Sequence, residues 1–65
     1  MSLDTTPRLA DPDALFTLLV AAHKGLDAET SRRLDARLVL LLANHIGDMD
    51  TLRQAIALAK DSAQG

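Results

Sequence analysis

The segment from Leu38 to Asp48 constrains the fold of this chain most, because it is apolar on every side before a glycine interrupts it. At about 100° per residue, a helix here divides its side chains between one stripe and the remaining surface. The stripe contains Leu34, Leu38, Leu41, Leu42 and His45. The sides and back contain Val39, Leu40, Ala43 and Ile46. A helix that is apolar on several faces needs cover from several directions, which a chain of 65 residues can hardly supply, so we expect self-association.

The composition predicts an all-α protein of the cytoplasm. Hydrophobic residues, mostly leucine and alanine, make up 48% of the chain and aromatic residues 2%, which favours helices over sheets. Cysteine is absent, which excludes disulfides and thiolate metal ligands and fits a reducing compartment. The first residues lack the basic segment and apolar core of a signal peptide. The longest apolar run, Leu38 to Ala43, is far shorter than the roughly 20 residues of a membrane-spanning helix.

Capping residues divide the chain into three predicted helices, at about residues 12–24, 28–46 and 49–61. Asp11, Asp27 and Asp48 are suited to cap their N-termini. Gly25 and Gly47 are expected to end the first two helices in the left-handed conformation. Residues 11–62 then form one helical domain, preceded by a flexible arm at 1–10 and followed by a frayed end at 63–65. The short connections favour two successive helical hairpins.

The first helix has apolar residues on two faces. Leu15, Leu18, Leu19 and Ala22, followed by Leu26 after the turn, form a stripe that is expected to face the second helix. The other face has no evident partner within the chain, and together with the side of the second helix it forms the predicted dimer surface. This surface consists of Phe16, Val20, Val39 and Leu40. The expected assembly is therefore a helical-bundle homodimer.

Two histidines are candidates for ligand or partner contacts. His23 and His45 each precede a helix-ending glycine by two residues, so in an antiparallel hairpin they lie at opposite ends. A shared metal site would need two chains, and we predict no metal site. The favoured interpretation is structural, because histidine near a helix C-terminus interacts well with the dipole and the last carbonyls. His45 is further expected to be buried beside the leucines of its stripe.

Asn44 and the arginines of the second helix allow two interpretations each. Asn44 lies near Arg37 on a narrow polar strip, which favours a solvated position, with a hydrogen bond that fixes register at an interface as the alternative. Arg32, Arg33 and Arg37 are interspersed with acidic residues, which favours a solvated, internally paired face over a phosphate contact. Possible interaction or ligand contacts are His23, Arg37, Asn44 and His45.

Several other classes of function lack support in the sequence. Asp48 and Asp50 resemble the start of a cation loop, but further ligands are missing and helix capping explains them better. A net charge of −2 without a basic block disfavours nucleic-acid binding, as does the scarcity of long polar side chains in the third helix. The sequence contains no glycine-rich phosphate loop and no His/Glu metal pattern, so we predict no cofactor and no enzymatic activity.

The segment Ala36 to Asp48, preceded by Ala22-His23-Lys24-Gly25-Leu26, resembles the bacterial family called domain of unknown function 2783. The resemblance extends over roughly residues 11–60. It implies a small protein without an assigned activity, and it suggests an association with flavin-dependent or aromatic-degrading oxidoreductases. It transfers no catalytic residue to this chain.

Three hypotheses of function follow from these patterns. The first is a homodimeric protein–protein interaction or accessory protein, with a larger protein as a further partner. The second is an enzyme subunit or ligand-binding protein whose site lies at the dimer interface. The third is a nucleic-acid-binding regulator.

Overall fold

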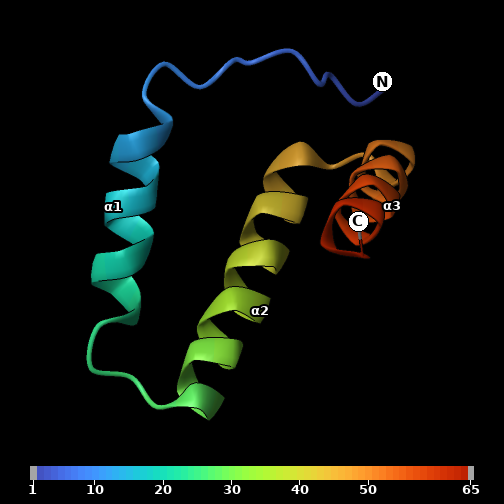
Figure 1. The fold of residues 1–65 in the computed structure, drawn as a ribbon. Helices are drawn as coiled ribbons and strands as arrows, with labels where there is room; N and C mark the ends of the chain where they lie inside the picture. Colours follow the sequence, from blue (N-terminus) through green and yellow to red (C-terminus); the bar gives the residue numbers. More distant parts are fainter. Residues whose placement is uncertain (1, 65) are drawn as a thin grey trace.

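The computed structural model describes residues 2–64, which form three helices and no strand (Figure 1). Their bounds are α1 (Pro12–His23), α2 (Ala28–Ile46) and α3 (Met49–Gln64). The predicted all-α class is confirmed. Met1, at the start of the predicted arm, and Gly65, at the predicted frayed end, lie outside the described residues.

An aspartate precedes each helix and accepts a hydrogen bond from the backbone N–H three residues later. For Asp11, Asp27 and Asp48 these bonds measure between 2.8 and 3.1 Å. Each bond satisfies one of the donors that a helix leaves unpaired at its N-terminus. The three helices therefore begin where the sequence predicts.

Each connection contains a glycine, and the predicted left-handed conformation is confirmed at Gly25 (φ 81°) and Gly47 (φ 69°). Helix α1 ends at His23, one residue earlier than predicted, because Lys24 is extended (ψ 127°) and serves as the C-cap. Helix α3 continues to Gln64, past the predicted end near residue 61, since neither glycine nor proline interrupts it before residue 65.

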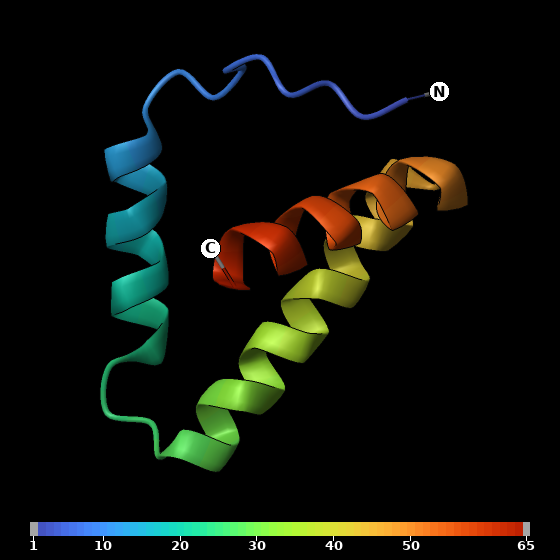
Figure 2. The ribbon, with the colours of Figure 1, turned by 45° about the vertical axis from the view of Figure 1, so that its right-hand side comes forward.

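The helices form two successive hairpins, α1–α2 and α2–α3 (Figures 1 and 2). Helices α1 and α2 are nearest at their connecting turn and diverge away from it in both views. Helix α3 turns back from the far end of α2, and backbone contacts between helices occur mainly between these two. The chain is therefore open on the side between α1 and α2.

Within the described part of the chain, no apolar residue is buried, and the buried residue is Thr51. The accessible surface is 5774 Å², whereas a compact chain of 7.0 kDa exposes about 4,000 Å². The radius of gyration is 13.4 Å, compared with about 11 Å for a compact domain of this length. The single chain thus lacks a closed hydrophobic core.

The predicted burial of His45 is wrong, because its side chain is exposed. Helix α1 has diverged from α2 at that end and does not close over the last turn. The apolar stripe of α2 is also incompletely covered, with Leu34 and Leu38 half-buried and Leu41 69% exposed. The stripe was identified correctly as apolar, but α1 alone does not cover it.

The segment before α1 has no helix and passes from α1 toward α3 (Figure 2). There the backbone N–H of Leu3 donates a hydrogen bond to Gln54 Oε1 at 3.2 Å. Among the described helices, none combines the length and the apolar character needed to cross a bilayer.

Candidate functional site

A large apolar depression lies between α1 and α2, and we call it the α1–α2 groove. Its volume is about 580 Å³. Its walls are Leu15, Leu18, Leu19 and Ala22 of α1 and Leu34, Arg37, Leu38, Leu41 and Leu42 of α2. The sequence correctly placed the α1 stripe toward α2. The sequence also predicted that α1 packs closely against α2, whereas the structure has an open groove between them.

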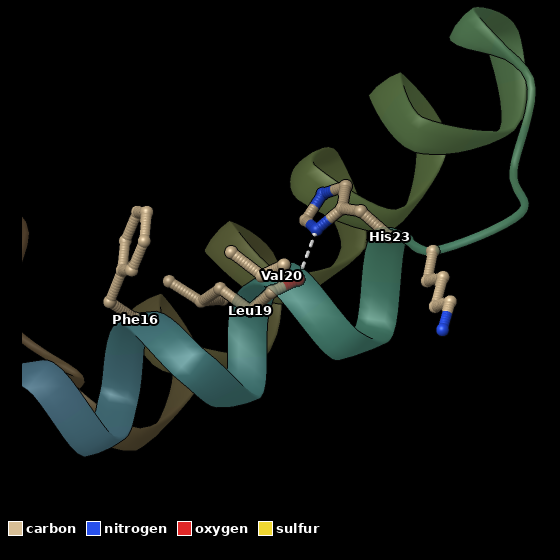
Figure 3. Close-up of a pocket in the computed structure, with 5 residues that line it drawn as sticks. Phe16, Leu19, Val20 and His23 are labelled. Carbon is tan, nitrogen blue, oxygen red and sulfur yellow. Dashed lines mark hydrogen bonds between the residues drawn. The ribbon is translucent and has the colours of Figure 1, made fainter.

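The four residues of the predicted dimer surface are all exposed, but they lie on two separate faces. Phe16 and Val20 line a hollow of about 450 Å³ along α1, together with Leu19, His23 and Lys24 (Figure 3). Val39 and Leu40 instead line the depression between α2 and α3. The structure therefore does not join them into one continuous patch within a single chain.

His23 contacts α2 through one ring nitrogen and bonds within α1 through the other. Nδ1 lies 2.6 Å from the Leu19 carbonyl oxygen (Figure 3), and Nε2 lies 2.7 Å from Asp35 Oδ1. Both oxygens are hydrogen-bond acceptors, and an imidazolium ring, which carries a proton on each nitrogen, can donate to both. The hydrogen bond to Leu19 and the contact with the Asp35 carboxylate raise the pKa of His23 above the ordinary histidine value.

Asp35 is the residue at this contact that the sequence analysis missed. It follows His23 by 12 positions, and no standard spacing rule joins residues across that turn. A usable signal existed, because on a helical wheel Asp35 lies beside Leu38 and Leu42, at the edge of the stripe that faces α1. A carboxylate at the edge of an apolar stripe is a candidate for a specific partner.

The four predicted contact residues do not form one site. Arg37 and Asn44 lie on the same side of α2 and line a hollow of about 370 Å³ with Leu40 and Leu41. Asn44 is exposed, in agreement with the solvated position that its sequence context favoured. His23 lies at the end of α1, and His45 lies in the last turn of α2.

Several charged side chains pair with neighbours on the same helix. Arg33 lies 3.7 Å from Glu29 in an exposed pair on α2, as expected for a solvated face. Arg53 lies 2.7 Å from Asp50 on α3. Asp48 caps α3, and hydrogen bonds from the Thr51 hydroxyl and backbone N–H lower the pKa of its carboxyl group. Capping and pairing therefore account for the two carboxylates that resembled a cation loop.

No cluster of three or more histidine or acidic side chains in the described part of the chain could hold a metal ion. The site that remains is a set of exposed apolar faces with a few polar groups at their edges. Such an arrangement can bury surface against another helix.

A family model described as "Protein of unknown function (DUF2783)" matches residues 3–61. The match covers all three helices apart from the last residues of α3. No curated protein and no solved structure matches the chain.

Proposed function

We propose that this chain, which belongs to the DUF2783 family of proteins of unknown function, is a small protein–protein interaction module that acts as a homodimer. The observation that carries the proposal is the exposure of its large apolar side chains, none of which is buried within the described residues. Exposed apolar patches of this extent are typical of interaction surfaces. The proposed role is an accessory one, without catalysis by this chain alone.

The size of the exposed surface supports a permanent partner over a transient one. The chain exposes 5774 Å², about 1,700 Å² more than a compact chain of its mass. Obligate dimers bury about 1,000–2,500 Å² on each subunit. The excess therefore falls within the area that a subunit of a stable dimer buries.

The ligand-binding alternative has less support from the groove. Binding sites for small molecules place a few polar groups on mostly apolar walls to orient the ligand. Among the described residues that line the α1–α2 groove, Arg37 alone is polar or charged. A helix, which needs apolar cover and few polar contacts, fits these walls better.

The nucleic-acid alternative also has little support, since the net charge is −2 and the Arg33 and Arg53 side chains pair with acidic neighbours. A larger protein partner, including the oxidoreductase that the family resemblance suggested, would bind the dimer through surface that remains exposed.

Sedimentation equilibrium of the purified chain tests the proposal. We expect a mass of twice 7.0 kDa throughout the micromolar range. A folded species of 7.0 kDa at high micromolar concentration would contradict it.

A further inference from the structure

Within the described residues, no segment outside α1 and α2 lines the α1–α2 groove. Helix α3 packs on another side of α2, where Leu52 and Ile56 line the depression that α2 and α3 share. The segment before α1 is held toward α3 by the hydrogen bond from Leu3 to Gln54. Because α1 and α2 diverge from their turn, their facing leucines leave a space that needs an occupant from outside the chain.

Helix α1 has the surface that such an occupant requires. Between Pro12 and His23, the non-terminal polar residues are Asp13 and Thr17, which lie next to each other on the helical wheel. The rest of the circumference is apolar. Helix α1 can therefore line its own groove with Leu15 and Leu18 and still present Phe16 on a separate face. A helix of this kind is stable only when it is covered from more than one direction.

We propose that the α1–α2 groove of each chain receives helix α1 of a second copy. This inference rests on the proposed homodimer and specifies which surface forms it. The exchange is reciprocal under twofold symmetry, because the same chain supplies both the groove and the helix that enters it. The α1 and α2 helices of the two chains then form a four-helix bundle around the leucines of the groove. Helix α3 remains on the outside of α2 in each subunit.

Two adjacent leucines provide a matched test. Leu40 and Leu41 are both 69% exposed, but Leu41 lines the groove and Leu40 does not. Leu41→Glu places a charge in the interface twice per dimer, so we expect the dissociation constant to rise by at least about 100-fold. Leu40→Glu should dimerise like the wild type. Both are measured by sedimentation equilibrium, with circular dichroism for helix content.

The outcomes separate this inference from the proposed function. A monomeric wild type would overturn the proposed function itself. A dimeric wild type in which Leu40→Glu dissociates and Leu41→Glu does not would overturn the inference alone, and would instead support the surface around Val39 and Leu40. The inference would also fail if both variants remained dimeric.

Because Leu41→Glu can unfold the chain as it dissociates, a photo-crosslinking experiment provides an independent test. Leu18→benzoylphenylalanine puts the probe on the groove wall of α1, and Leu58→benzoylphenylalanine puts it on exposed α3 as a control. Unlabelled probe-bearing protein is mixed with ¹⁵N-labelled wild type, subunits are exchanged, and the sample is irradiated. We expect the Leu18 probe to link unlabelled chains to α1 or α2 of labelled chains, and the Leu58 probe to give no such link. Links to labelled α3 alone, or no links between chains in a dimeric sample, would refute the inference.

Discussion

His23 is the residue whose side chain joins α1 to α2, through its contact with Asp35. Its pKa is raised in the folded chain, so the contact stabilises the fold fully at pH values below the unfolded value of about 6.5. This contribution is lost as the pH rises through the raised pKa. We therefore expect the thermal midpoint of the wild type to fall between pH 6 and about pH 9, and His23→Gln to remove most of this decrease.

His45→Gln is the matched control, because it removes the other histidine and leaves the contact between His23 and Asp35 in place. The comparison is kept above about pH 5, since the pKa values of Asp27 and Asp48 are lowered by their capping hydrogen bonds. Those carboxylates stabilise the fold above their unfolded pKa and lose this effect in acid. If the decrease with pH persists in His23→Gln and disappears in His45→Gln, it depends on His45, and the prediction is contradicted.

At the scale of the element, Gly47 sets where α2 ends and how α3 turns back. Its φ of 69° is strained for a branched side chain, although an added Cβ would meet only the Asn44 carbonyl oxygen at 3.8 Å. We expect Gly47→Val to lower the free energy of unfolding by about 1–3 kcal/mol. Gly47→Asn should cost less, because asparagine tolerates the left-handed region. Urea unfolding monitored by circular dichroism measures both variants, and equal losses would show that backbone strain is not the cause.

Helix boundaries could be predicted from the sequence because the signals that fix them are local. Asp27 and Gly47 act on backbone groups within four residues, so their effect does not depend on the remainder of the chain. The difference at Lys24 concerns one residue, which is an extended C-cap where the sequence predicted the last helical residue. The contact between His23 and Asp35 was not predicted, because it depends on how two helices cross.

At the scale of the whole molecule, the apolar faces could be predicted but their partners could not. The wheel placed Leu41 on the stripe that faces α1, and Leu41 does line the groove. Whether such a stripe is closed depends on the volume between the helices, which the 3.6-residue period does not encode. The four candidate contact residues do not form one site, since His23 lies at the end of α1 and His45 lies in the last turn of α2.

The central claim is that this chain completes its core with a second copy. For a protein whose folding requires association, the thermal midpoint rises with protein concentration, because the folded state is favoured by mass action. We therefore predict a steady increase in the thermal midpoint over about a hundredfold range of concentration, followed by circular dichroism. A cooperative transition whose midpoint stays constant over that range would show that the single chain is stable by itself, and would contradict the claim.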